Sequence, residues 1–303
     1  MFSERINNMN VTMDLSKLPY EAKVALANDE QASPEFLAAL ATDKDRRIRI
    51  LVAWHSGTPS KVLDTLVNDC DSVVRRAVAE NGNTFAKTLA KLANDIDEDV
   101  RMAVGENKNT KEETLAMLAK DKKEWVREAV ASNPNALPET LELLTEDTAK
   151  FVRGAVARNK NAPEKVFLKL AKDENSINRH YVASNPNVPA EILAFLAKDD
   201  EWRVRYAVAR NENTPKEALT VLAQDEEECV RSEVAANENT SIDVLAMLAS
   251  DKEVWIRFAV AGNSNTPLNA LETLADDENL RVSEKAENVL KERLIKGKCG
   301  IEK

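Results

Sequence analysis

The chain has 303 residues, of which 43% are hydrophobic and 31% charged, and its formal net charge is −10 at pH 7. This length ordinarily predicts two domains, and the acidic balance argues against a general binder of nucleic acid or of anionic membranes. Only 7 residues are glycine, and the glycine motifs of dinucleotide folds, P-loops and nucleophile elbows do not occur, which argues against those enzyme classes.

The first segment, residues 1–16, precedes the repeats and is expected to be disordered. It has no apolar stretch as long as a secretory signal needs, and no run of about 18 apolar residues occurs anywhere in the chain, which excludes a transmembrane helix. The three cysteines, Cys70, Cys229 and Cys299, form no C-x-x-C pair, and the chain has only two histidines. The sequence therefore predicts no disulfide framework, no metal site and no cofactor, and a cytoplasmic location.

Residues 17–42 are expected to form an N-terminal capping repeat. They keep Leu37 and Leu40 where later repeats have leucine, but Lys23 stands where later repeats have arginine, and the asparagine pair described below is missing. The end of a repeat array has one face without a neighbour, so departures from the pattern are expected there.

Residues 43–276 contain nine regular repeats with a step of 26 residues and no insertion. Each repeat begins with an aspartate (Asp43 in the first) and has an arginine six residues later (Arg49), followed by an Asn-x-Asn pair that is first complete at Asn81 and Asn83. A repeat reads D-x4-V-R-x-A-V-A-x-N-x-N-T-P-x3-L-x2-L-A. A constant period of this length indicates an array of stacked units.

Each repeat is predicted to contain two helices. In the first, Val126, Ala129 and Val130 stand at i, i+3 and i+4 and give one apolar stripe. The aspartate is expected to be the N-cap of this helix, and Asn133 is expected to close it in the left-handed conformation. The second helix is expected to begin with a capping box at residues 214–217, with the proline at its first position. Neither helix can bury its stripe alone, so neighbouring repeats must stack.

Residues 277–303 are expected to form a C-terminal capping helix and a basic tail, because this segment is longer and more polar than the helices of the repeats. The chain is therefore predicted to be all-α, a HEAT-like solenoid of about ten two-helix repeats with no β-sheet. A stacked array needs no second core, so it replaces the expectation of two domains.

The repeat, with its V-R-x-A-V-A, N-x-N-T-P and L-x2-L-A segments, resembles the leucine-rich repeat variant family over about residues 17–276. The resemblance implies a right-handed superhelix without β-sheet, with one α-helix and one shorter helix, often 3₁₀, in each repeat. Some relatives carry a cysteine-rich iron–sulfur module ahead of the repeats, but no cysteine precedes Cys70, so this module is not expected here. The family is not tied to one biochemical activity.

The aspartate and arginine columns are interpreted as a structural ladder, because an active site breaks the symmetry of a repeat whereas a scaffold keeps it. Each arginine is expected to bind an aspartate of its own or of the adjoining repeat, and replacing Arg153 by leucine is expected to loosen the array. The members singled out for this role are Asp121, Arg127, Asp147, Arg153, Asp199 and Arg205.

The asparagine columns are expected to satisfy backbone N–H and C=O groups of the loops. His55 takes the first asparagine position of its repeat. It has no companion histidine or cysteine nearby, so it is interpreted as a loop residue and not as a metal ligand.

Recognition is expected on side chains that face outward and differ between repeats. On the first helix these stand at i, i+4 and i+8, opposite the apolar stripe. Tryptophan, tyrosine and arginine are enriched in binding hot spots. The candidate partner-binding residues are Trp54, His180, Trp202, Tyr206, Arg210 and Phe258. The alternative is that these rings pack against a neighbouring loop or against a second copy of the chain.

Two further apolar columns occur in the repeat. The residue directly before the Val-Arg pair is interpreted as packing between repeats, with members Trp125, Phe151, Ile177, Cys229 and Trp255. A column on the second helix leaves two alternatives open, the floor of a groove for a peptide or helix and partial burial against the next repeat. Its members are Met117, Leu143, Phe195, Val221 and Met247.

The leading hypothesis for function is a non-catalytic scaffold that binds a protein or peptide through the solenoid surface. The alternative is a nucleic-acid-binding helical-repeat protein, which needs a recurrent basic column, but the only such column is the arginine matched by aspartate. An enzyme would need titratable groups gathered in one concavity, and the sequence shows no triad, metal cluster or phosphate cradle. A membrane partner is not expected, and homo-oligomer formation is left open.

Overall fold

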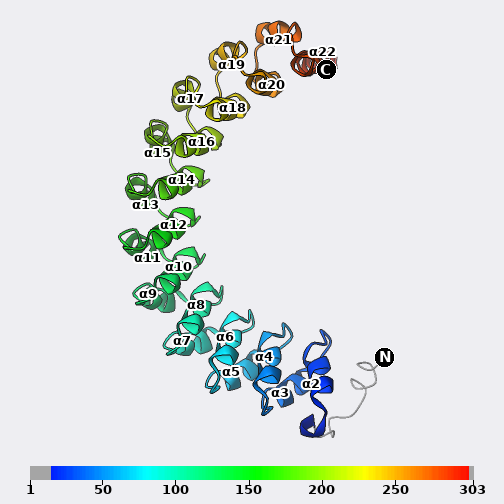
Figure 1. Cartoon of the computed structure of the whole chain (residues 1–303), viewed down its shortest axis with the longest axis vertical. Helices are drawn as coiled ribbons and strands as arrows, with labels where there is room; N and C mark the ends of the chain where they lie inside the picture. The colour runs from blue at the N-terminus through cyan, green and yellow to red at the C-terminus, as the bar shows by residue number, and fades with distance from the viewer. Residues whose placement is uncertain (1–14, 300–303) are drawn as a thin grey trace. The chain divides into compact units, whose positions relative to one another are not determined.

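The computed structural model describes residues 15–299, and these residues form helices with no strand among them (Figure 1). The all-α prediction is confirmed. The segment predicted to be disordered lies outside the described residues up to position 14, and the short 3₁₀ helix η1 (Leu15–Lys17) follows it. The chain divides into two compact parts, one ending at Asn161 and one beginning at Ala162, here called the N-terminal and C-terminal bodies.

The N-terminal body stacks its helices in two layers (Figure 1). The first layer begins with α2 (Tyr20–Ala27) and continues with nine-residue helices, each in contact with the next: α4 (Arg46–Trp54), α6 (Ser72–Glu80), α8 (Glu98–Glu106), α10 (Glu124–Ser132) and α12 (Lys150–Arg158). The second layer consists of seven-residue helices: α3 (Pro34–Leu40), α5 (Ser60–Leu66), α7 (Ala86–Leu92), α9 (Glu112–Leu118) and α11 (Pro138–Leu144).

The C-terminal body repeats this arrangement. Its first layer consists of α14 (Ser176–Ser184), α16 (Trp202–Arg210), α18 (Glu228–Ala236) and α20 (Val254–Gly262). Its second layer consists of α13 (Glu164–Leu170), α15 (Ala190–Leu196), α17 (Lys216–Leu222), α19 (Ile242–Leu248) and α21 (Leu268–Ala275). The longer helix α22 (Leu280–Cys299) packs against α20 and α21. No helix within residues 15–299 is both long enough and apolar enough to cross a lipid bilayer.

The core lies between the two layers, where the predicted stripes meet. Val126, Ala129 and Val130 of α10 are buried, as are Leu219 and Leu222 of α17. Small side chains allow neighbouring first helices to approach closely. A Cβ added to Gly105 of α8 would lie 3.0 Å from the Cβ of Ala129, closer than packed carbon atoms ordinarily stand.

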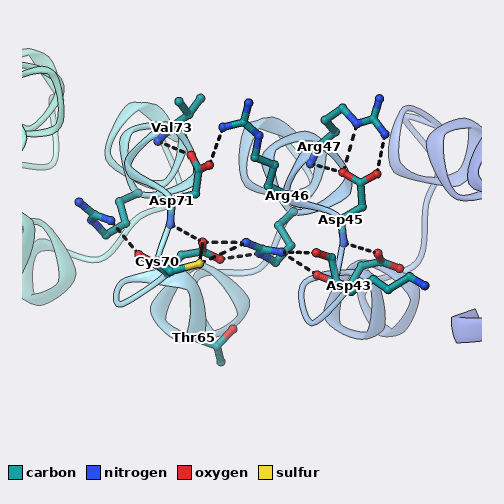
Figure 2. A network of polar contacts seen from close by, with 12 residues as sticks. Asp43, Asp45, Arg46, Arg47, Thr65, Cys70, Asp71 and Val73 are labelled. Carbon is teal, nitrogen blue, oxygen red and sulfur yellow. Dashed lines mark hydrogen bonds and ion pairs between the residues drawn. The ribbon is translucent and has the colours of Figure 1, made fainter.

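The first helices begin and end differently from the prediction. The N-cap of α4 is Asp45, whose side chain accepts from the N–H of Arg47, and Asp43 instead accepts from the N–H of Asp45 (Figure 2). At the other end, Asn133 has φ −73° and ψ 130°, and no described residue has a positive φ. The predicted aspartate N-cap and left-handed closure are therefore wrong, because both side chains are engaged with the adjoining repeat.

The capping box predicted at residues 214–217 does not form. Pro215 is the N-cap of α17 and no side chain caps this helix. Thr214 is buried, and its hydroxyl donates to the carbonyl of Val208, 2.5 Å away. The threonine therefore ties the loop back to the first helix instead of starting the second. The same bond recurs at Thr58, Thr84, Thr110, Thr240 and Thr266.

The asparagine pairs join each loop to the loop of the preceding repeat. Nδ2 of Asn133 donates to the carbonyls of Gly105 and Asn107, at 2.6 and 3.1 Å, and its Oδ1 accepts from the N–H of Asn135 at 2.9 Å. Asn135 in turn donates to the carbonyl of Lys108 at 2.6 Å. These bonds satisfy backbone groups that no helix uses, and Asn133 is buried where it makes them. Equivalent bonds from the first asparagine occur at Asn81, Asn107, Asn159, Asn211, Asn237 and Asn263.

The N-terminal repeats keep the same bonds with other residues. Nζ of Lys23 lies 2.6 Å from the carboxylate of Asp43 and replaces the ladder arginine. Nδ1 of His55 accepts from the N–H of Gly57 at 3.0 Å, so Nε2 carries the proton and donates to the carbonyl of Asp29 at 2.9 Å. His55 thus makes the bonds of the asparagine it replaces, and both of its ring nitrogens are occupied.

The C-terminal helix closes the last loop. Residues 277–299 contain no Asn-x-Asn pair, and the guanidinium of Arg293 takes the place of the asparagine donors. It donates to the carbonyls of Ser264 and Thr266, each at 2.6 Å, and more weakly to that of Asn263. A single arginine therefore satisfies three of the four carbonyls that an Asn-x-Asn pair satisfies elsewhere.

Candidate functional site

The ladder consists of two-pronged ion pairs between successive repeats. Nε and Nη2 of Arg127 lie 2.5 and 2.8 Å from the carboxylate of Asp147, and Nη1 donates to the carbonyl of Asp121 at 2.8 Å. Arg153 donates in the same way to the carbonyl of Asp147. Arg127 therefore bonds both its own repeat and the next. Equivalent ion pairs are Arg49–Asp69, Arg75–Asp95, Arg101–Asp121, Arg179–Asp199, Arg205–Asp225, Arg231–Asp251 and Arg257–Asp277.

The charges of the ladder are permanent at neutral pH. Burial raises the pKa of Asp95, Asp121 and Asp147, but hydrogen bonds from an arginine and from a backbone N–H outweigh burial and leave the pKa of each below its ordinary value. A general acid or base works best with a pKa near the operating pH. These aspartates are therefore suited to holding repeats together and not to proton transfer.

Acid is expected to unfold the chain through this ladder. The pKa of Asp95, Asp121 and Asp147 is lower in the folded state than the unfolded value of about 3.9. Their contribution to stability is therefore complete above that value and is lost as the pH falls from it through the lower, folded-state pKa. Urea unfolding followed by circular dichroism is expected to give a constant midpoint from pH 7 to about 5 and a steep fall below about 4. A midpoint unchanged at pH 3 would contradict this role.

Three of the six candidate partner-binding residues line one pocket in the C-terminal body. His180 comes from α14, and Tyr206 and Arg210 come from α16. Together with Ser184 and Pro186 they line a pocket of about 490 Å³. The packing of α14 against α16 places the outward lines of two successive first helices side by side, and the pocket lies between them.

Hydrogen bonds fix the orientation of the pocket's side chains. Nδ1 of His180 lies 2.9 Å from the carbonyl oxygen of Arg203. Because a carbonyl oxygen can only accept a hydrogen bond, Nδ1 carries the proton. Nε2 is then the acceptor and lies 3.5 Å from Oγ of Ser184. The hydroxyl of Tyr206 donates to Glu233 at 3.0 Å. Burial, together with the negative charge of Glu233, raises the pKa of Tyr206, so the phenol stays neutral.

Trp202 supports this pocket from outside. Its ring meets that of Tyr206 edge to face, with centroids 6.5 Å apart, and the guanidinium carbon of Arg203 lies 4.6 Å from the centroid of the Trp202 ring. Trp202 is half-buried. The ring therefore limits the motion of Tyr206, which lines the pocket itself.

The two remaining candidates lie elsewhere. Phe258, on α20, is exposed and does not line this pocket. Trp54 belongs to the N-terminal body, where it is exposed and its Nε1 donates to Glu80 at 2.7 Å. The predicted set therefore does not form one site, and only its members on α14 and α16 converge.

A second pocket adjoins the first and shares Arg210 and Glu212 with it. Its volume is about 370 Å³, and its lining also includes Glu233, Glu238 and Asn239. Sequence reasoning missed the glutamates because it searched the i, i+4 and i+8 line of the first helices, and Glu233 of α18 lies one residue off that line. Glu212 and Glu238 are middle residues of Asn-x-Asn loops, and the variation of that position between repeats was the available signal. The two pockets together are here called the loop groove.

The column directly before the Val-Arg pair is exposed, and its interpretation as packing between repeats is wrong. Trp125, Phe151 and Trp255 are 38%, 59% and 50% exposed. Successive helix residues differ by about 100° in direction, so the residue before the core valine turns out of the helix–helix contact. Lysine side chains partly cover two of these rings, with Nζ of Lys123 and of Lys150 4.8 and 5.2 Å from the centroids of the Trp125 and Phe151 rings.

The apolar column of the second helices is about half exposed. Its five members, Met117, Leu143, Phe195, Val221 and Met247, are between 41% and 53% exposed. The second layer therefore presents apolar side chains to solvent in both bodies, on the opposite layer from the loop groove.

Comparison with known proteins identifies the repeat. Residues 202–227 match a family model described as leucine rich repeat variant. A solved structure described as a leucine-rich repeat variant with a novel repetitive protein structural motif is 26% identical to this chain, covers 74% of it and 88% of its own length, and has a TM-score of 0.57. The 26-residue unit is therefore similar to a leucine-rich repeat variant repeat. In this chain, both helices of a repeat are α-helical, and the matched segment contains Tyr206, Arg210 and Glu212 of the loop groove.

Two other solved structures are less similar to this chain. An engineered protein is 16% identical, covers 93% of this chain and 98% of its own, and has a TM-score of 0.37. The YibA protein of E. coli is 20% identical, covers 91% of this chain and 98% of its own, and has a TM-score of 0.38. No curated protein matches the sequence.

Proposed function

We propose that this chain is a non-catalytic scaffold that binds a protein partner through the loop groove of its C-terminal body. The observation that carries this proposal is the convergence of His180, Tyr206 and Arg210 on one pocket. The ladder and asparagine residues recur in every repeat and bond to each other or to the backbone, whereas these three differ from their counterparts in other repeats. Residues that break the symmetry of a repeat without serving its packing are the ones expected to serve binding.

The residue types and their rigidity support binding. Tyrosine and arginine are enriched at hot spots, where rings that are held before binding lose little conformational entropy. The Tyr206 ring is held by Trp202 and by the bond to Glu233. Arg210 is exposed and forms no ion pair within residues 15–299. Its guanidinium interacts with the hydroxyl of Tyr206 and, because it is exposed, can also reach a partner.

The site chemistry supports a non-catalytic role. Within the described residues, no group of three histidine, cysteine, aspartate or glutamate side chains is placed to hold a metal ion. The one hydroxyl beside an imidazole in the groove, Ser184, is 3.5 Å from His180, beyond the reach of about 2.6–3.2 Å typical of a working nucleophile and base.

Affinity capture from native lysate tests the proposal. The double variant Trp202→Ala, Tyr206→Ala is expected to lose at least one protein that the wild type captures. The matched control, Phe195→Ala, Met247→Ala, removes exposed apolar side chains from the second layer of the same body and is expected to keep that protein. Identical captured sets for the wild type and the groove variant, with unchanged circular dichroism, would refute the proposal.

A further inference from the structure

The second pocket of the loop groove carries excess negative charge. Glu212, Glu233 and Glu238 line it together with a single cation, Arg210. None of the three glutamates forms an ion pair with a basic group in the described part of the chain. Glu233 and Glu238 instead accept hydrogen bonds from the hydroxyls of Tyr206 and Ser264. These neutral donors do not offset the carboxylate charges, and Arg210 can offset only one of the three, so the pocket is complementary to a cation.

The first pocket has different walls. The rings of His180 and Tyr206 line it with the apolar Pro186 and Ala207. Aromatic and proline surfaces lose water easily and pack against flat or branched apolar groups. This pocket therefore suits an apolar or aromatic side chain, next to a pocket that suits a cation.

The second asparagine of each loop adds a hydrogen-bond acceptor to each pocket. Asn213 lines the first pocket and Asn239 the second. Each uses Nδ2 to donate to a carbonyl of the preceding repeat, that of Pro186 or of Glu212. Their Oδ1 atoms accept no hydrogen bond from residues 15–299. Two amide oxygens, one repeat apart, are therefore placed to accept main-chain N–H groups of a bound segment.

The spacing of the pockets indicates an extended ligand. They belong to successive repeats, and packed helices are about 8–10 Å apart. A polyproline II segment has three residues per turn and rises about 3.1 Å per residue. It therefore presents residues i and i+3 on one side, about 9 Å apart. One side chain can enter each pocket while main-chain N–H groups between them face the asparagines.

We propose that the loop groove binds an extended segment of a partner protein. A lysine or arginine of this segment enters the pocket lined by Glu212, Glu233 and Glu238. An apolar or aromatic side chain three residues away enters the pocket lined by His180 and Tyr206. This inference rests on the proposed scaffold function and specifies the partner's chemistry.

Selection from a phage-displayed library of random twelve-residue peptides tests this inference with the full-length chain as the target. Selected peptides are expected to be enriched in a lysine or arginine with an apolar residue three positions away. The enrichment is expected to disappear with the groove variant Glu212→Gln, Glu233→Gln, Glu238→Gln. The matched control changes the same number of exposed carboxylates on the second layer of the same body, Glu191→Gln, Glu217→Gln, Glu272→Gln, and is expected to leave the enrichment intact.

Titration of one selected peptide, made by synthesis, measures how much each variant weakens the binding affinity. Fluorescence anisotropy is expected to show binding at least about 10-fold weaker to the groove variant and less than about 2-fold weaker to the control, because only the groove variant loses hydrogen bonds from the peptide's cation to carboxylates. Replacing the peptide's basic residue by alanine is expected to weaken binding to the wild type by a similar factor and to have little further effect on the groove variant.

Four outcomes would overturn the inference. They are selection of acidic peptides, absence of a basic residue from the selected set, equal weakening by both triple variants, and concentration-dependent dimerisation lost only in the groove variant, which would assign the groove to a second copy. The scaffold proposal has a separate readout. If lysate capture still depends on Trp202 and Tyr206 while peptide selection shows no basic preference, the scaffold function stands and the inferred ligand class is wrong.

Discussion

Replacing Arg101 by leucine is expected to lower the free energy of unfolding by about 3–5 kcal/mol, the cost typical of breaking one half of a buried ion pair. Arg101 is buried, and its Nε and Nη2 lie 2.6 and 3.2 Å from the carboxylate of Asp121. Its Nη1 also donates to the carbonyl of Asp95 at 2.7 Å. Leucine would leave a charged carboxylate and a carbonyl in a site with little water. Urea unfolding followed by circular dichroism measures the loss.

A charge-removing double variant controls for the change in shape. In Arg101→Met, Asp121→Asn the buried charge is gone, and the amide oxygen can still accept from the N–H of Lys123, as the carboxylate does at 2.9 Å. The double variant is expected to recover much of the lost stability. If it is as unstable as the single variant, the uncompensated charge is not the cause. Because each repeat contacts only its neighbours, hydrogen exchange should accelerate first in α8, α9 and α10.

Replacing Asn133 by alanine is expected to cost about 3 kcal/mol or more. The change removes two donated bonds, to the carbonyls of Gly105 and Asn107, and one accepted bond from the N–H of Asn135. A buried polar group that loses its partner costs about 1–3 kcal/mol, and Asn133 is buried. Thermal or urea unfolding of Asn133→Ala, compared with the wild type, measures this cost.

The neighbouring Asn135 provides the matched control. It is exposed and makes its short bond to Lys108 at the surface, where water can replace it, so Asn135→Ala is expected to cost about 1 kcal/mol. The variant Asn133→Asp keeps the shape but points a carboxylate at two carbonyls, and it is expected to be at least as unstable as the alanine variant. Wild-type stability of Asn133→Asp would show that the donated bonds are dispensable.

The predicted apolar stripes and the predicted ladder, which recur every 26 residues, agree with the structure. The valine and leucine stripes are buried, and the pairs Arg75–Asp95, Arg127–Asp147 and Arg205–Asp225 join adjoining repeats. Such features can be predicted from the sequence because the same packing or charge requirement recurs in each repeat. Even the exceptions follow the rule, since Lys23 and His55 make the bonds of the arginine and asparagine they replace.

The local rules failed where a side chain's partner lies in another repeat or another helix. Thr214 has the sequence context of an N-cap, yet its hydroxyl bonds the carbonyl of Val208. Asn133 has the context of a left-handed helix end, yet it remains extended and reaches the loop before it. Trp125 sits beside the core valine in sequence but turns toward solvent. Capping rules consider only neighbours in sequence, whereas the packing of helices and repeats brings other hydrogen-bond partners within reach of these side chains.

In the candidate site, His180, Tyr206 and Arg210 could be predicted from the sequence, because helical periodicity fixes which residues face away from a buried stripe. The sequence does not show that these three meet in one pocket while Phe258 lies outside it. It also does not show that Glu212, Glu233 and Glu238 line the adjoining pocket. These residues come from different helices and loops, and the stacking of repeats, not any local pattern, sets the distances between them.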